Sequence, residues 1–231
     1  MGKPGCTGRV FLLGRLVDVK KKRAGRERAD VPESGEELER FGVERLGGVE
    51  EGWIAGGELA GQKLGGVALK CCIVEGVSLA GSAVSSTRLR DVRFVKCDFS
   101  NARMRGMEAT RVEFIGCRMT GLVATECVWQ DVLVEGCDAR YAQWNDGRAK
   151  GCEFRESNLG EADLRGTALS DVVLAEVDLR GADLSGVVLE GIDLRGAEIE
   201  GMVVRAEDVR GAIVTAPQAM ELARLLGVVI R

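Results

Sequence analysis

The sequence predicts a solenoid, a chain wound into short repeated turns, and three observations that share a five-residue period support this fold class. From Leu59 to Val204 every fifth residue is apolar, thirty positions in a chain that is 45% apolar overall. The residue two positions before each of these is nearly always small, and glycine recurs two positions after them. A period of five fits neither an α-helix, which repeats every 3.6 residues, nor a strand, which repeats every two.

Each of the three positions has a physical role in such a turn. The large and the small apolar residues face a narrow core, the glycine lets the backbone bend, and the polar residues between them face water. Six of the eight cysteines fall at the small inward position, where cysteine acts as a compact apolar residue. We therefore expect reduced, structural thiols rather than a disulfide framework or a metal site: Cys72, Cys97, Cys117, Cys127, Cys137 and Cys152.

Four segments carry a family resemblance. Residues 162–166, 177–181, 182–186 and 192–196 read ADLRG, VDLRG, ADLSG and IDLRG. They resemble the A-(D/N)-L-x-x signature of the pentapeptide repeat family, and the match covers residues 57–206. The resemblance implies an all-β fold, a right-handed quadrilateral β-helix with four pentapeptides to a coil. Residues twenty apart should then stack about 4.8 Å apart, which puts Trp129 between Ala109 and Ala149.

Residues 1–56 lie outside the repeat, and we interpret them as an extension that caps the open end of the solenoid. Residues 9–19 are apolar enough for a strand or hairpin, and residues 36–46 show weak helical spacing that allows a short helix. Between them, residues 20–28 form a basic run that could touch phosphates. A solvated loop is the favoured interpretation, because four acids follow at once: Glu33, Glu36, Glu37 and Glu39.

Residues 207–231 predict a short C-terminal capping helix. Thr215 and Gln218 form a capping-box pattern at its start, and Gly227 stands where a glycine commonly ends a helix. Apolar residues at helical spacing and an apolar tail follow, which invites a partner at this end. In the family resembled here the C-terminal end forms a twofold dimer, so the resemblance implies a homodimer built on Leu222, Leu225, Leu226 and Val229.

Charge is unevenly distributed along the predicted rod. Residues 59–118 hold ten Lys/Arg and five Asp/Glu, whereas residues 119–204 hold seven and seventeen. An acidic rod could occupy a DNA-binding saddle by the electrostatics that attract DNA. The resemblance extends to family members that mimic DNA and bind DNA gyrase, with this candidate acidic surface: Asp138, Glu161, Asp163, Asp178, Asp183, Asp193 and Glu198.

Outward valines and a leucine could instead form an apolar contact surface among the acids: Val123, Val128, Leu133, Val173, Val188 and Val203. Two functions therefore stay open. The favoured one is a non-enzymatic protein-interaction scaffold with an unknown partner. The alternative is a DNA mimic that binds DNA gyrase or topoisomerase IV and modulates it or protects it from a poison. The unbroken repeat frame and the N-terminal extension count against drug protection.

An enzyme is disfavoured because the chain has no histidine, the commonest general base and metal ligand, and no nucleotide-binding or nucleophile-elbow motif. We expect no catalytic residue, no cofactor, no metal and no direct binding of nucleic acid. No apolar run is long enough for a membrane span, and a signal-peptide pattern is lacking, so the sequence indicates a cytoplasmic protein.

Overall fold

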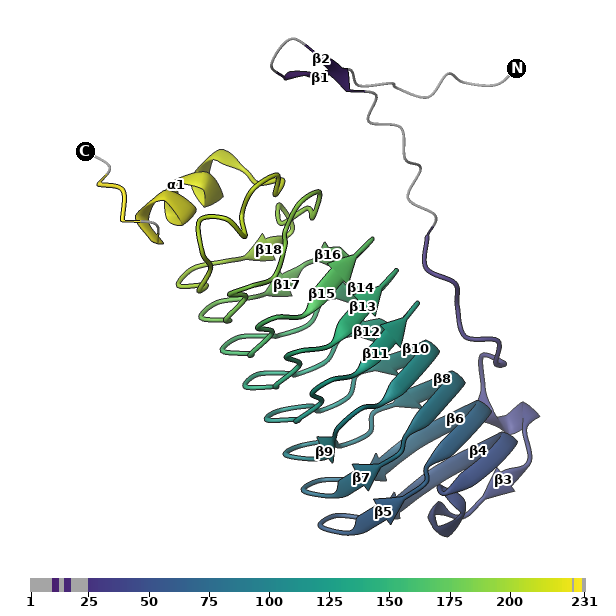
Figure 1. Ribbon diagram of the computed structural model, residues 1–231. Coiled ribbons are helices and arrows are strands. Elements are labelled where there is room, and N and C mark those ends of the chain that lie inside the picture. Colours follow the sequence, from purple (N-terminus) through teal and green to yellow (C-terminus); the bar gives the residue numbers. More distant parts are fainter. Residues whose placement is uncertain (1–9, 13–14, 18–24, 226, 230–231) are drawn as a thin grey trace, which may run out of the picture.

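The structure is a computed structural model that describes residues 10–12, 15–17, 25–225 and 227–229. Figure 1 shows a stack of parallel coils with one short helix at its C-terminal end. The stack contains about eight coils. The all-β solenoid with a C-terminal helix is therefore confirmed.

Parallel pairing between residues twenty apart defines the coil. Two adjacent faces carry the longer strands β4 (Gly48–Glu58), β6 (Ala68–Ser78), β8 (Arg88–Val95) and β10 (Glu108–Ile115). The same faces continue as β11 (Val128–Gln130), β12 (Leu133–Glu135), β13 (Arg148–Lys150), β14 (Glu153–Arg155), β15 (Ala168–Ser170) and β16 (Val173–Ala175). The third face carries β5 (Lys63–Gly65), β7 (Ala83–Ser85) and β9 (Arg103–Met104), and the fourth β17 (Val177–Asp178) and β18 (Ala197–Glu198).

The five-residue frame fills the core as predicted. Twenty-six of the thirty frame residues are buried, and the other four pack half-buried against them: Leu64, Leu169, Leu174 and Val204. Trp129 pairs in register with Ala109 on one side and Ala149 on the other, which confirms the four-cornered coil. Large side chains fit the narrow core because small ones lie above and below them.

The small inward residues also satisfy backbone carbonyls. The Sγ of Cys97 lies 3.4 Å from the carbonyl oxygen of Val74, and the hydroxyl of Ser157 lies 3.3 Å from that of Val134. In both pairs the acceptor comes 23 residues earlier, in the previous coil. Cysteine, serine and threonine are useful here because they add a donor without adding volume.

The parallel ladder is longer than the repeat boundaries at residues 57 and 206 suggested. At the N-terminal side, Gly48 already pairs with Ala68. At the other end, Asp193 forms a bridge with Ile213. The physical reason is that the five-residue apolar spacing continues beyond both ends of the frame. Two buried residues precede position 59 and two half-buried residues follow position 204: Val49, Ile54, Val209 and Val214.

The N-terminal end is covered by short elements and not by the short helix considered for residues 36–46. Two 3₁₀ turns, η1 (Gly35–Glu37) and η2 (Val43–Arg45), flank β3 (Arg40–Phe41), which pairs in parallel with β4. A strand fits this place better than a helix because the edge of β4 offers unpaired backbone groups. Further upstream, β1 (Val10–Leu12) and β2 (Arg15–Val17) form an antiparallel pair. The core of the basic run, residues 20–24, lies outside the described residues.

The C-terminal helix α1 (Ala216–Leu225) starts at the predicted capping box. The Thr215 amide donates to the side-chain oxygen of Gln218 over 2.9 Å, and the Gln218 amide lies 3.4 Å from the Thr215 hydroxyl. The amide nitrogen of the Gln218 side chain donates to the carbonyls of Leu194 and Ala197 over 2.7 and 2.8 Å. One side chain therefore caps both the helix and the last coil of the rod.

Candidate interaction surface

The predicted acidic surface is largely neutralised by its own arginines. Four of its aspartates pair with the arginine two residues later, at 2.6 to 2.8 Å: Asp138 with Arg140, Asp163 with Arg165, Asp178 with Arg180, and Asp193 with Arg195. Residues two apart on a strand point to the same side, so the sequence Asp-Leu-Arg by itself places the arginine beside the aspartate. The hydrogen bond from the arginine lowers the pKa of the carboxyl in the first three pairs.

The other three predicted acids differ from one another. Asp183 lies 3.6 Å from Arg165, and Glu198 lies 3.4 Å from Arg180, so both join the same arginine rows. Glu161 is exposed at a corner of the coil, where its φ is 57°. Five other acids of residues 119–204 share with it a positive φ at a corner and, within the described residues, the lack of an ion pair. We call these six the corner acids: Asp131, Asp146, Glu156, Glu161, Asp171 and Glu176.

The residues expected at a dimer interface do not share one environment. Leu222 is buried and belongs to the core of the rod, so the helix uses it to close the solenoid. Leu225 is exposed, and Val229 is 78% exposed. Leu226 lies outside the described residues. A contact between two copies at this end remains a proposal based on Leu225 and Val229.

The outward apolar residues are spread over three faces. Val123 and Val203 share one column, four coils apart, and Val128 and Val188 lie on the next face. They therefore do not form one patch. Leu133 and Val173 lie on the face formed by β12, β14 and β16 together with residues 93–95 and 113–115. We call it the covered face, because the chain itself covers it.

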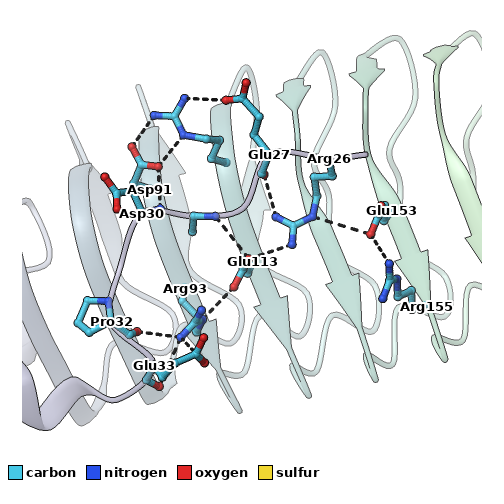
Figure 2. A network of polar contacts seen from close by, with 12 residues as sticks. Arg26, Glu27, Asp30, Pro32, Glu33, Asp91, Arg93, Glu113, Glu153 and Arg155 are labelled. Atoms are coloured by element: carbon cyan, nitrogen blue, oxygen red, sulfur yellow. Dashed lines mark hydrogen bonds and ion pairs between the residues drawn. The ribbon is translucent and has the colours of Figure 1, made fainter. Parts of the chain in front are cut away.

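Residues 25–33, here called the N-terminal strap, run along the covered face across several coils (Figure 2). The residues beneath the strap point outward from β8, β10, β12 and β14 and are aligned by the parallel register: Arg93, Glu113, Leu133 and Glu153. We call this column the strap column. Leu133 is only 6% exposed although it points away from the core.

Glu113 is the centre of the contacts between the strap and the rod. Its carboxylate accepts hydrogen bonds from Arg26 and Arg93, both at 2.9 Å, and lies 3.4 Å from the amide of Ala29. The residue is 3% exposed. Burial raises the pKa of Glu113, but the hydrogen bonds from Arg93 and Arg26 outweigh burial and hold the pKa below its ordinary value. The carboxylate is therefore charged and fully compensated.

A second buried acid fixes the middle of the strap. Asp91, 4% exposed, receives two hydrogen bonds of 2.7 Å from Arg111, and these lower its pKa. Its Oδ1 also accepts the amide of Asp30 over 3.0 Å. Arg93 completes the attachment by donating to the carbonyl of Pro32 over 2.9 Å. Charged side chains of the rod thus satisfy the backbone of the strap.

A groove of about 550 Å³ remains open beside the strap. One wall is formed by the strap, and the floor includes a second outward column, two residues further along each strand than the strap column. We call it the open column, and it combines apolar and charged residues: Val95, Ile115, Glu135 and Arg155. Figure 2 shows that the arginine at its end, Arg155, turns toward Glu153, with which it forms an ion pair of 2.7 Å.

Sequence reasoning did not find this site. The basic run containing Arg26 was interpreted as a solvated loop, and the strap has no apolar periodicity. The outward positions of this column hold opposite charges and a leucine at twenty-residue spacing. Another outward column mixes the same residue types, with Arg88, Glu108, Val128 and Arg148, so the pattern alone did not single out this face. Charges at such positions need a partner if they are buried.

Comparison with known families places the repeats independently. A family model for a pentapeptide repeat region matches residues 87–164, and a second model, for pentapeptide repeats in eight copies, matches residues 173–202. No curated protein matches the sequence. Within the described residues no helix is long and apolar enough to cross a membrane.

Two solved structures are similar to this chain at low identity. One is HetL, a pentapeptide repeat protein involved in heterocyst differentiation regulation from the cyanobacterium Nostoc sp. strain PCC 7120. It is 16% identical over 73% of this chain and 87% of its own, with a TM-score of 0.36. The other is QnrB1, a plasmid-mediated fluoroquinolone resistance protein. It is 20% identical over 84% of this chain and 95% of its own, with a TM-score of 0.30.

Proposed function

Because the chain belongs to the pentapeptide repeat family, we propose that it is a non-enzymatic protein-interaction scaffold whose binding site is the groove beside the N-terminal strap. The supporting observation is that this face already holds one extended segment, the strap, and keeps a groove of about 550 Å³ next to it. Half-buried Val95 and Ile115 supply apolar area there, and Glu135 and Arg155 supply charge. A mixed apolar and polar surface of this kind suits a protein partner.

The test compares a groove variant with a variant on another face. Ile115→Lys places a charge in the groove. Val188→Lys places the same charge on an exposed valine of the neighbouring face, which is not among the residues that line the groove. Partners captured from the source cells are identified by mass spectrometry and then purified for direct titration. We expect binding to survive Val188→Lys and to weaken at least tenfold with Ile115→Lys. Equal binding by both variants would reject the groove.

A second candidate is a DNA mimic that binds DNA gyrase or topoisomerase IV. The observation that favours it is the excess of acids in residues 119–204, where the six corner acids lack an ion pair within the described residues. The aspartates of the D-L-R pairs are poorer candidates because each carboxylate is already bound to an arginine. The corner acids would carry the interaction by long-range attraction to a basic saddle.

A supercoiling assay with purified gyrase distinguishes the two sets of acids. Glu156→Gln, Glu161→Gln and Glu176→Gln together should relieve any inhibition caused by the wild type. Asp138→Asn, Asp163→Asn and Asp178→Asn together remove the same number of charges from paired positions and should have less effect. If the wild type leaves gyrase unaffected at micromolar concentration, with and without a fluoroquinolone, this candidate is rejected.

A further inference from the structure

We propose that the strap column is a docking site for an extended peptide segment of a partner protein, and that residues 25–33 occupy it in the free chain. The segment would carry an arginine followed three residues later by a small residue. This inference rests on the proposed scaffold function and names the chemistry of its partner. The strap itself shows which chemistry the column accepts.

The arginine slot is the most selective part of the site. The Arg26 side chain is 5% exposed, and its Nη2 donates to Glu113 over 2.9 Å. Its Nε lies 4.0 Å from Glu153. Two carboxylates two coils apart thus flank one guanidinium, a geometry that a lysine ammonium would satisfy less well because it lacks the planar fork.

The position three residues later accepts only a small side chain. Ala29 is buried, and its backbone amide points at Oε1 of Glu113, the oxygen that also accepts the hydrogen bond from Arg26. A larger residue there would move the backbone away from the rod and break both contacts. Beyond this point Arg93 donates to the carbonyls of Pro32 and Glu33, at 2.9 and 3.4 Å. Arg93 therefore binds the backbone of the segment and does not select a side chain at these two positions.

The strap can exchange because it is not part of the solenoid ladder. Among the described residues, no backbone-to-backbone hydrogen bond joins residues 25–33 to a coil. Its attachment consists of side-chain contacts to outward residues. Beneath it, the core is already closed by Phe94, Phe114 and Phe154. Removal of the strap would therefore leave every coil intact and would expose two buried acids that attract a replacement cation.

A partner must compete with a tethered strap. A short tether gives an intramolecular segment an effective concentration in the millimolar range, so a free peptide of equal affinity cannot displace it at micromolar concentration. The strap thus sets the affinity that a partner segment must exceed to bind the strap column. A partner segment gains access if it makes additional contacts in the adjacent groove or if the strap is weakened.

The test uses the full chain with a weakened strap. Arg26→Glu places a negative charge beside Glu113 and Glu153 and leaves the rod unchanged. A fluorescent peptide with the sequence of residues 24–35 is titrated by anisotropy. We expect it to bind the Arg26→Glu chain at least tenfold more tightly than the wild type. The same peptide with glutamate in place of its arginine should bind at least tenfold more weakly.

A second variant identifies the site. Glu113→Gln added to the Arg26→Glu chain should abolish peptide binding, whereas Glu75→Gln, at an exposed position of the same face, should not. Circular dichroism melting verifies that each chain is folded. A folded Arg26→Glu chain that does not bind the peptide, or that binds it equally well after Glu113→Gln, would overturn the proposal.

Two further outcomes separate the alternatives. If the wild type forms a concentration-dependent dimer in sedimentation that Glu113→Gln abolishes, a second copy of this chain is the occupant, and the partner proposal is overturned. If the peptide fails while a captured partner still responds to Ile115→Lys, the scaffold function stands and only the strap chemistry is wrong.

Discussion

The Nη2 of Arg26 lies 2.9 Å from the Oε1 of Glu113, although 87 residues separate them in the chain. The contact joins an N-terminal segment without repeats to the middle of a repetitive rod. Each repeat of a solenoid normally contacts only the repeats next to it along the chain. This pair breaks that rule, and its chemistry leads to the first prediction.

Docking of the strap should depend on pH in one direction. The pKa values of Glu113 and Asp91 lie below their ordinary values in the folded protein. Groups with a depressed pKa stabilise the folded contact above their unfolded pKa, roughly 4, and lose that effect as the pH falls through the folded value. Amide exchange, corrected for intrinsic pH dependence, should show Ala29 and Asp30 protected from pH 7 to about 5 and unprotected in stronger acid.

Replacing the carboxylate should remove this protection at all pH values. Glu113→Gln removes the carboxylate that two buried guanidinium groups contact at 2.9 Å, and removing one partner of a buried ion pair costs about 3–5 kcal/mol. The loss should be local, with a melting temperature close to that of the wild type. Protection of Ala29 that disappeared already between pH 7 and 6 would contradict the assignment to carboxylates.

The second prediction concerns packing around Trp129. Ala149→Leu adds volume directly beside the indole and should destabilise the protein by about 1–3 kcal/mol, and Trp129→Ala should cost about 3–5 kcal/mol. Together they should cost less than their sum, because the leucine fills part of the space left by the indole. Urea denaturation measures all three. Ala168→Leu, on an exposed outward position, is the control and should change stability by about 0.5 kcal/mol or less.

The third prediction concerns the end of the rod. Gln218→Ala removes the donors to Leu194 and Ala197 and should cost about 2 kcal/mol, with faster amide exchange confined to the last coil. Gln218→Glu keeps an acceptor for the Thr215 amide but points an oxygen at both carbonyls, so it should be at least as destabilising. A Glu variant as stable as the wild type would show that the helix cap alone matters. Met220→Ala, exposed in the same helix, serves as the control.

The fourth prediction concerns thiol reactivity. Burial raises the pKa of Cys127 to about 11 and that of Cys152 to about 12, and the alkylating species is the thiolate. Among the described cysteines, half-buried Cys71 should react first with iodoacetamide at pH 8. The buried ones should react only when the coils open in denaturant. Peptide mapping by mass spectrometry follows each site, and rapid labelling of native Cys127 would contradict the burial.

The repeat part of the fold was predictable because its information is local and periodic. The frame specified which side chains enter the core, and the four repeats per coil that the family resemblance implies placed an alanine on either side of Trp129. The frame also extends to Ile54 and Val209, which the motif-based boundaries excluded. The D-L-R sequence also implies that the arginine two residues later lies on the same side as Asp163 or Asp178 and can pair with it. The sequence analysis counted these aspartates as an acidic surface and overlooked this pairing.

The strap was not predictable for a physical reason. Its contacts are between charged side chains that have no periodicity and lie far apart in sequence, so a pattern search classifies Arg26 as solvated. What reveals it is the burial of Glu113 and Asp91, which depends on the three-dimensional arrangement of the coils.

The reach of the strap has a mechanical consequence. Arg93 and Glu113 hold it on two successive coils, and Arg26 extends its reach toward a third contact at Glu153. A force that pulls on the N-terminus therefore loads the middle of the rod before it loads the first coil. Stretching in an optical trap should show one early rupture, when the strap detaches from the rod, followed by a series of smaller steps as the coils unfold.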